Sequence, residues 1–154
     1  MMRVEPACLA DLDGWLQLAR EVEPLFGPMA DSPDFQAALK QAIACHEAFC
    51  IRSGPHGALP MLTGAVVVSK AANEVTWLAV AGGQRGQGLG KALIAAALSL
   101  LDGTRPITVQ TFAPSVPEGR AARNLYLGCG FTDHRDAGLN PAGVPTVVMR
   151  LGAS

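Results

Sequence analysis

Residues 74–101 read EVTWLAVAGGQRGQGLGKALIAAALSLL. The first seven of these residues predict a strand over Glu74–Val80, and the apolar run from Ala92 to Leu101 predicts a helix. Several glycines separate the two elements. Glycines let a backbone approach a ligand closely, and N–H groups at a helix N-terminus converge on an anion with the helix dipole behind them. The order strand, glycine loop, helix therefore predicts a phosphate cradle, and we expect a diphosphate as its ligand.

Two familiar phosphate-binding motifs do not fit this loop. If the end of a Walker A motif is laid on Gly90-Lys91, Arg85 falls on its first glycine and Ala92 on its hydroxyl position. The dinucleotide fingerprint fails in both registers, because Lys91 or Leu93 then takes the place of the third glycine. The pattern that does fit is Arg-x-x-Gly-x-Gly, over residues 85–90.

Length and composition narrow the function. The 154 residues fit one domain spanning residues 1–154, which is large enough to bury about two-thirds of its unfolded surface. Net charge is -1 and 49% of the residues are hydrophobic, so nothing indicates a basic face for nucleic acid. We expect a small-molecule partner.

Cysteine usage and hydropathy indicate the compartment. Cys8, Cys45, Cys50 and Cys129 lack zinc-ribbon spacing and are too few for a secreted disulfide scaffold, so we expect reduced thiols in the core and no metal site. The N-terminal residues lack the apolar stretch of a signal peptide, and no run approaches the roughly 18 apolar residues of a membrane span. These features predict a cytoplasmic protein without membrane association, and the excess of arginine over lysine with abundant alanine favours a bacterial source.

Hydrophobic periodicity predicts the remaining elements. A first helix is expected from about Leu9 to Val22, ended by Pro24, Gly27 and Pro28, and a second one from an N-cap at Ser32 to about His46. A short helix is expected at residues 119–128, and strands at residues 2–5, 48–52, 59–69, 106–112, from 131 onward, and 146–151. Residues 21–29, EVEPLFGPM, mix carboxylates with large apolar side chains, so we expect them to line a site.

A second motif lies at residues 122–131, which read ARNLYLGCGF. Together with Arg-x-x-Gly-x-Gly it resembles the GNAT acetyltransferase superfamily, whose coenzyme A (CoA) pyrophosphate loop has the form Arg/Gln-x-x-Gly-x-Gly/Ala and whose second signature is Ala-x-x-Leu-Tyr-x-x-x-Gly-Phe. The resemblance covers the whole chain and is strongest from Glu74 to Phe131. It implies an α/β (α+β) fold, with one mixed, mostly antiparallel sheet of about six to seven strands, splayed at the CoA site and flanked by about four helices. The segment EVEPLFGPM also resembles a bacterial subgroup of these proteins.

The resemblance implies that acetyl-CoA is the co-substrate. Its pantetheine arm would pair with the backbone of Leu78, Ala79 and Val80 as a surrogate strand, and an N–H group of Leu78 or Val80 would hold the thioester carbonyl and the oxyanion. The alternative to a pyrophosphate site in the glycine loop is a turn with a purely structural role, whose charged residues are simply solvated. The pyrophosphate would lie on the N–H groups of Arg85, Gly86, Gln87, Gly88, Leu89, Gly90 and Lys91.

The resemblance also implies catalytic residues. Tyr126 takes the family position of the general acid and would protonate the leaving thiolate, whose thiol has a pKa of ~8.5; alternatively its ring only packs under the sulfur. Glu74 resembles the catalytic glutamate of the histone-acetylating branch, or is a solvated carboxylate at a strand start. Glu21 and Glu23 compete with it as base, attract a cation, or face water; with Phe26 they are the expected acceptor-binding residues.

Two departures from the family pattern affect the CoA site. Gly119 stands where the family often has an asparagine, so a hydrogen bond to the pantetheine is either missing or supplied by Asn124 or a backbone group. Ala81-Gly82 stands where His-Pro or Asn-Pro commonly precedes the loop, which predicts a looser loop.

Taken together, these residues predict an acetyltransferase that acts on a primary amine of a small molecule, with cationic amines among the expected acceptors. Two alternatives remain: a non-catalytic acyl-CoA-binding or regulatory domain, and acetylation of a protein or peptide amine. Dimers are frequent in families of this kind, so a homodimer is included among the expectations.

Overall fold

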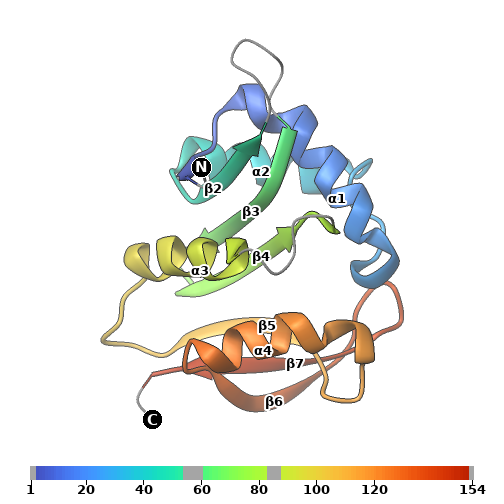
Figure 1. The fold of residues 1–154 in the computed structure, drawn as a ribbon, viewed down its shortest axis with the longest axis vertical. Coiled ribbons are helices and arrows are strands. Elements are labelled where there is room, and N and C mark those ends of the chain that lie inside the picture. Colours follow the sequence, from blue (N-terminus) through green and yellow to red (C-terminus); the bar gives the residue numbers. More distant parts are fainter. Residues whose placement is uncertain (1–2, 54–60, 83–87, 153–154) are drawn as a thin grey trace.

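The computed structural model describes residues 3–53, 61–82 and 88–152, and its centre is one seven-stranded sheet (Figure 1). The strand order is β1-β2-β3-β4-β5-β7-β6, and every neighbouring pair is antiparallel except β4 with β5, which are parallel. The strands are β1 (Val4–Pro6), β2 (Ala48–Ser53), β3 (Met61–Ser69), β4 (Glu74–Val80), β5 (Ile107–Phe112), β6 (Thr132–Leu139) and β7 (Pro145–Leu151).

Four α-helices cover the two faces of this sheet. Helices α3 and α4 lie on one face, and α1 and α2 lie on the other (Figure 1). Their bounds are α1 (Leu12–Phe26), α2 (Pro33–Ala44), α3 (Leu89–Leu100) and α4 (Arg120–Gly128), with single 3-10 turns at η1 (Leu9–Asp11) and η3 (Pro117–Gly119). The predicted order of elements and the mixed, mostly antiparallel sheet are confirmed; residues 2, 59 and 60 of the predicted strands lie outside the described residues. Within the described ranges, every helix is too short or too polar to cross a lipid bilayer.

The sheet splays between β4 and β5. Their ladder contains two Cα pairs, Glu74 with Thr108 and Val75 with Val109. Beyond Val75 the two strands separate, whereas β3 pairs with β4 as far as Val80. The expected splay is therefore present, and it leaves one edge of β4 without a strand beside it.

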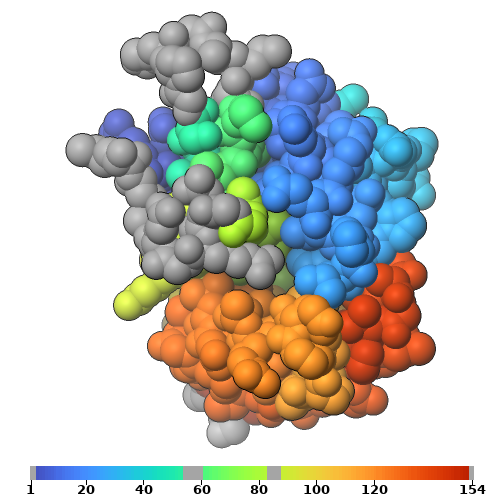
Figure 2. All heavy atoms as spheres, turned by 45° about the vertical axis from the view of Figure 1, so that its right-hand side comes forward, coloured from blue at the N-terminus to red at the C-terminus, as the bar shows by residue number. Residues whose placement is uncertain are grey.

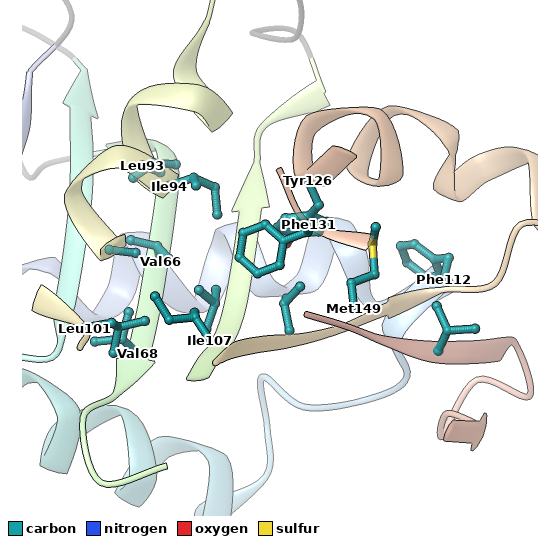
Figure 3. Close-up of a cluster of buried hydrophobic side chains, with 14 of the residues drawn as sticks. Val66, Val68, Leu93, Ile94, Leu101, Ile107, Phe112, Tyr126, Phe131 and Met149 are labelled. Atoms are coloured by element: carbon teal, nitrogen blue, oxygen red, sulfur yellow. The ribbon is translucent and has the colours of Figure 1, made fainter. Parts of the chain in front are cut away.

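Apolar side chains pack on both faces of the sheet. One cluster joins the sheet to α3 and α4 and includes Leu93, Ile94, Phe131 and Met149, each with no more than a trace of exposure (Figure 3). A second cluster, around the fully buried Trp15, joins the sheet to α1 and α2. Burial of apolar surface stabilises by about 25 cal/mol per Å², so these two clusters fix the helices that carry the site.

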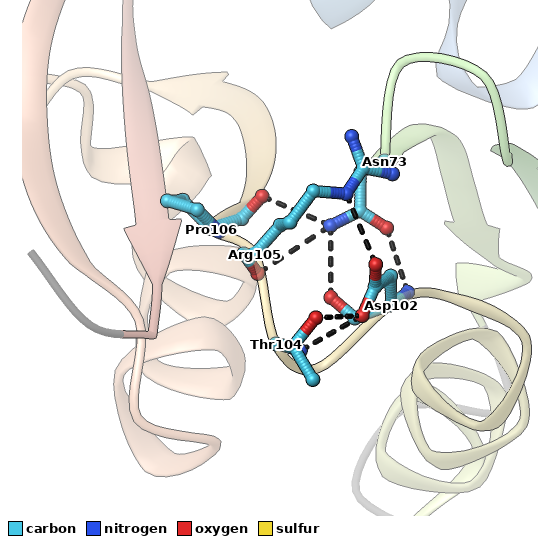
Figure 4. Close-up of polar contacts among 5 residues, drawn as sticks. All are labelled: Asn73, Asp102, Thr104, Arg105 and Pro106. Atoms are coloured by element: carbon cyan, nitrogen blue, oxygen red, sulfur yellow. Dashed lines mark hydrogen bonds and ion pairs between the residues drawn. The ribbon is translucent and has the colours of Figure 1, made fainter.

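Asn73 closes the end of the sheet where β4 and β5 still pair. It is 2% exposed and has a φ of 55°, a left-handed conformation that asparagine tolerates better than most residues. Its amide nitrogen donates to the carbonyl oxygens of Asp102 and Pro106, both at 3.0 Å, and its amide oxygen accepts from the Asp102 N–H at 2.7 Å (Figure 4). The β3–β4 turn is thereby bound to the connection between α3 and β5.

The sequence prediction for the end of α1 is wrong by one turn. Pro24 lies inside the helix, which continues to Phe26 and ends at Gly27 with a φ of 104°. The missing proline N–H costs one helical hydrogen bond, but Phe26 packs on Trp77 and Phe112, with ring centroids 6.4 and 5.6 Å apart. Tertiary packing thus outweighs the local proline signal.

The expectation of core thiols holds for one cysteine and is wrong for the others. All four cysteines are free, but Cys8 and Cys45 are exposed and Cys129 is half-buried. Cys50 is buried in β2, and burial raises its pKa to about 12, which leaves an unreactive thiol.

Candidate active site

Two adjoining hollows occupy the gap between β4 and β5. We call them the inner hollow, of about 210 Å³, and the outer hollow, of about 270 Å³. The inner hollow is lined by Phe26, Val75, Thr76, Trp77, Leu78, Val109, Gln110, Thr111, Phe112, Ala122, Tyr126, Asn140 and Thr146. The outer hollow is lined by Val22, Leu25, Phe26, Leu78, Ala79, Val80, Gly88, Leu89, Gly90, Lys91, Phe112, Glu118, Ala121, Ala122 and Leu125. They share Phe26, Leu78, Phe112 and Ala122, so the two hollows lie side by side.

The outer hollow contains the N-terminus of α3. Gly88 is the N-cap with a φ of 79°, in open space, so glycine is needed there for its conformation. The N–H groups of the first helical turn have no intrahelical partner, and the helix dipole adds partial positive charge, so an anion is favoured at this end. Of the predicted loop, Gly88 to Lys91 line the hollow, and residues 85–87 lie outside the described residues.

Gly90 has a different role from Gly88. A Cβ at Gly90 would lie 2.9 Å from Cδ2 of Leu125 on α4. The space left by the missing side chain is therefore occupied by Leu125, and Gly90 lets α4 approach the start of α3.

The open edge of β4 presents backbone N–H groups to the site. The Ala81 N–H donates to the Thr63 carbonyl at 2.8 Å, toward β3. Backbone direction alternates along a strand, so the Ala79 N–H also points toward β3, while the N–H groups of Leu78 and Val80 point toward the gap. Both residues line the outer hollow, where a surrogate strand would pair with them.

A β-bulge at Thr76 lets consecutive residues of β4 reach the inner hollow. Val75 pairs with Val68 and Trp77 with Val67, so Thr76 is the extra residue, and its hydroxyl donates to the Val67 carbonyl at 3.1 Å. A regular strand would send alternate side chains to opposite faces. Here residues 75–78 all line the inner hollow.

Tyr126 lies in the wall of the inner hollow and is 4% exposed. Its ring packs edge-on against Phe131, with centroids 5.7 Å apart (Figure 3). Burial raises the pKa of the Tyr126 phenol above its ordinary value, so the hydroxyl stays protonated at neutral pH. Among the described residues, no hydrogen bond engages this hydroxyl.

Arg123 holds the helix that carries Tyr126. Its guanidinium donates two hydrogen bonds of 2.8 Å to the Asp133 carboxylate and one of 3.3 Å to the Phe112 carbonyl. At the other end of α4, a Cβ at Gly119 would lie 2.3 Å from that of Phe112. This close packing explains why glycine stands where the family often has an asparagine.

The carboxylates expected from the sequence do not line either hollow. Glu23 accepts the N–H groups of Met29 at 2.8 Å and Ala30 at 2.9 Å, hydrogen bonds that lower its pKa, so it organises the connection after α1. Glu21 accepts from the Gly82 N–H at 3.4 Å, beyond the end of β4. Glu74 begins β4, next to Val75.

The two other expected site residues differ in their placement. Phe26 lines both hollows. Asn124 is exposed on α4 and lines neither of them.

Several polar residues of the inner hollow had no sequence signal that singled them out. These are Thr76, Gln110, Thr111, Asn140 and Thr146. The clearest available hint is Gln110, an exposed polar residue of β5 between the buried residues Val109 and Thr111. None of the described lining residues of this hollow is Asp, Glu, His, Lys or Arg.

No group of three or more His, Cys, Asp or Glu that could hold a metal ion occurs in the parts of the chain that the structure describes.

The inner hollow is covered where α1 meets the β6–β7 turn. The Asn140 side chain donates to the Leu25 carbonyl at 2.8 Å, and a Cβ at Gly27 would lie 2.6 Å from that of Pro141. In Figure 2 the blue surface of the N-terminal helices meets the red-orange surface of the C-terminal strands. These two segments are in direct contact.

Comparisons with known proteins agree on one family. Residues 43–133 match a family model described as an acetyltransferase (GNAT) domain. A comparison of the sequence with curated proteins found no match.

Solved structures with this fold include proteins bound to acetyl-CoA or coenzyme A. YncA from Salmonella typhimurium with acetyl-CoA superposes with a TM-score of 0.71 at 15% identity, over 100% of this chain and 95% of that one. The diaminobutyrate acetyltransferase EctA from Paenibacillus lautus, with L-2,4-diaminobutyric acid and coenzyme A, gives 0.72 at 16% identity, over 99% and 95%. The NatC complex bound to Gag peptide and CoA gives 0.71 at 17% identity, over 99% of both chains.

Proposed function

The chain belongs to the GNAT acetyltransferase superfamily, and we propose that it transfers the acetyl group of acetyl-CoA to a primary amine of a small molecule. One observation carries this proposal: a buried, protonated Tyr126 lies in a hollow that adjoins, along the open edge of β4, the hollow at the N-terminus of α3. In this proposal the Tyr126 hydroxyl is the proton donor in the inner hollow. The N–H groups of Leu78 and Val80 are the free backbone donors, and the N-terminus of α3 in the outer hollow is the anion site.

The described residues fit the parts of acetyl-CoA in order. The N–H groups of the first turn of α3 would hold the pyrophosphate, together with the predicted residues 85–87. The free N–H groups of Leu78 and Val80 would pair with the amides of the pantetheine arm. When bound, acetyl-CoA supplies a reactive thioester at the inner hollow.

The reaction would use two kinds of donor from this chain. The amine nitrogen attacks the thioester carbon, and a free N–H group of β4 stabilises the negative charge that forms on the oxygen. The carbon–sulfur bond then breaks, and the Tyr126 hydroxyl donates its proton to the departing sulfur. The attacking nitrogen also loses a proton. Glu74 lines neither hollow and Glu118 lines only the outer one, so we propose that water accepts this proton and that solvent returns a proton to Tyr126.

The contact between the end of α1 and the β6–β7 turn favours a small acceptor over a peptide. An extended peptide needs an open groove along which its backbone can lie. Here Asn140 and Pro141 of the β6–β7 turn contact the end of α1 directly, so the chain is closed over this side of the inner hollow.

Two measurements test this function and separate it from a binding domain without catalysis. Acetyl-CoA should raise the thermal unfolding midpoint, because a ligand that binds only the folded state stabilises it. Thiol release from acetyl-CoA should then depend on added amine in a panel of small primary amines. Stabilisation by acetyl-CoA without thiol release for any amine would contradict the proposal and favour an acyl-CoA-binding or regulatory domain.

A further inference from the structure

Gln110 carries an oriented amide in the inner hollow. Its Nε2 donates to the Thr146 hydroxyl oxygen at 3.0 Å, and the Thr146 hydroxyl donates to the Gly138 carbonyl at 2.9 Å. A hydroxyl has one proton, so Thr146 cannot also donate to Gln110 and must accept from it. This chain of hydrogen bonds fixes which end of the amide is NH₂. The amide oxygen, Oε1, therefore points away from Thr146, and no described residue donates to it.

The described residues that line the inner hollow carry no charge. Their polar groups are hydroxyls and amides; Thr111 is 7% exposed, whereas Thr76 and Gln110 are exposed to solvent, and the other side chains are aliphatic or aromatic. An ionised group that enters this site meets no opposite charge among these residues. The wall thus accommodates hydrogen-bonding and apolar groups better than ions.

We propose, building on the function proposed above, that the acceptor is a primary amine whose remaining atoms carry no charge, and that Oε1 of Gln110 accepts a hydrogen bond from its nitrogen. The attacking form of the amine is the neutral one, whose nitrogen has a free lone pair. The amide oxygen takes one N–H of that nitrogen and leaves its lone pair free for the thioester.

The same chemistry disfavours a second cationic centre on the acceptor. The two carboxylates expected to attract one are engaged elsewhere: Glu23 binds backbone N–H groups and Glu21 lies beyond the end of β4. Neither lines the inner hollow. The cationic acceptor expected from the sequence therefore has no counter-charge among the described residues of this hollow.

Three amines with equal numbers of heavy atoms test the proposal: hexylamine, 5-amino-1-pentanol and cadaverine (1,5-diaminopentane). They differ at the far end, which is a methyl, a hydroxyl or a second ammonium group. We expect kcat/KM for hexylamine and 5-amino-1-pentanol to exceed that for cadaverine by about 10-fold or more, the discrimination that a binding pocket commonly provides. A wild-type preference for cadaverine would overturn the proposal and leave the acetyltransferase function intact.

A charge placed in the wall should reverse the selectivity. Gln110→Glu adds a carboxylate of nearly the same shape, and we expect it to shift the ratio of kcat/KM values toward cadaverine by about 10-fold or more. Gln41→Glu, the same change on an exposed position of α2, should leave the ratio unchanged. A folded Gln110→Glu variant with the wild-type ratio would overturn the role of Gln110. Turnover of none of the three amines, while other amines of the panel are acetylated, would overturn this inference and leave the proposed function intact.

Discussion

At the scale of single residues, Tyr126 is the proton-bearing side chain of the inner hollow. Its phenol is 4% exposed, and burial raises its pKa, so at neutral pH the hydroxyl holds its proton. The same shift makes the proton harder to release, so transfer to the sulfur depends on the thiolate that forms as the carbon–sulfur bond breaks. The hydroxyl also has no hydrogen-bond partner among the described residues. An unengaged donor in a hollow beside the open edge of β4 is available to the sulfur of a bound thioester.

We predict that Tyr126→Phe lowers kcat by ~10²-fold, with a change in the KM for acetyl-CoA of no more than a few fold, because only the proton donor is lost. The phenyl ring keeps its contact with Phe131, so the thermal unfolding midpoint should stay close to that of the wild type. Steady-state kinetics at saturating amine measure this. An unchanged kcat with a raised KM would leave Tyr126 a positioning role only.

The pH dependence of the reaction follows from the uncharged wall of the inner hollow. An ordinary primary amine has a pKa of ~10, so its neutral fraction rises tenfold per pH unit between about pH 6 and 9, and kcat/KM should rise with it. The raised pKa of Tyr126 keeps the acid protonated throughout this range, so no falling limb is expected below about pH 10. Glu74→Gln should give the same profile. A plateau present in the wild type and lost in this variant would identify Glu74 as the base.

Some residues of the site can be predicted from a sequence motif, whereas others are brought together only by the fold. Tyr126 belongs to a recognisable sequence signature. Gln110 and Thr146 belong to none, because they become neighbours only when β7 pairs with β5. Glu23 shows the opposite case: its place among apolar residues suggested a site, but its carboxylate is used by the backbone of the next turn.

At the scale of elements, the outer hollow depends on how closely α4 approaches the start of α3. Leu125 fills the space beside Gly90, and both residues line the hollow. The sequence predicted a helix from Ala92, whereas α3 begins three residues earlier, at Leu89, and residues 83–87 of the predicted loop lie outside the described residues. The sequence also could not distinguish Gly88, which is needed for its positive φ, from Gly90, which is needed for the approach of α4.

We predict that Gly90→Ala raises the KM for acetyl-CoA by about 10-fold and destabilises the fold by about 1–3 kcal/mol, because the new methyl group displaces Leu125 into the hollow. Acetyl-CoA titration and chemical denaturation measure the two effects.

The double variant Gly90→Ala/Leu125→Ala serves as the control for this prediction, since it removes the clash and should recover most of the affinity. An affinity as weak in the double variant as in the single one would place the effect in the backbone of α3 rather than in packing.

At the scale of the whole molecule, the site exists because two halves of one sheet are joined at one end and separated at the other. The joint consists of two residue pairs between β4 and β5 and the hydrogen bonds of Asn73 to the α3–β5 connection (Figure 4). Strand periodicity predicted each strand separately. The point at which the halves part depends on tertiary contacts of Asn73, which looks in the sequence like an ordinary turn residue.

The gap between β4 and β5 exposes backbone N–H groups in the middle of the sheet, and their hydrogen exchange rates can be measured. In the free protein, the N–H groups of Leu78 and Val80 face the gap, so we predict that they exchange faster than those of Ala79 and Ala81, which point toward β3. Residue-resolved NMR exchange measures the four rates.

Acetyl-CoA should protect the Leu78 and Val80 N–H groups selectively if its pantetheine arm takes the place of the missing strand. At a ligand concentration of about 100 Kd, their exchange should slow by up to ~100-fold, because exchange then waits for dissociation. Ala79 and Ala81 serve as internal controls, since their N–H groups already have partners in β3 and should change far less. Equal rates for all four in the free protein would show that the edge of β4 is covered. Unchanged Leu78 and Val80 rates in a protein that acetyl-CoA stabilises would place the coenzyme elsewhere.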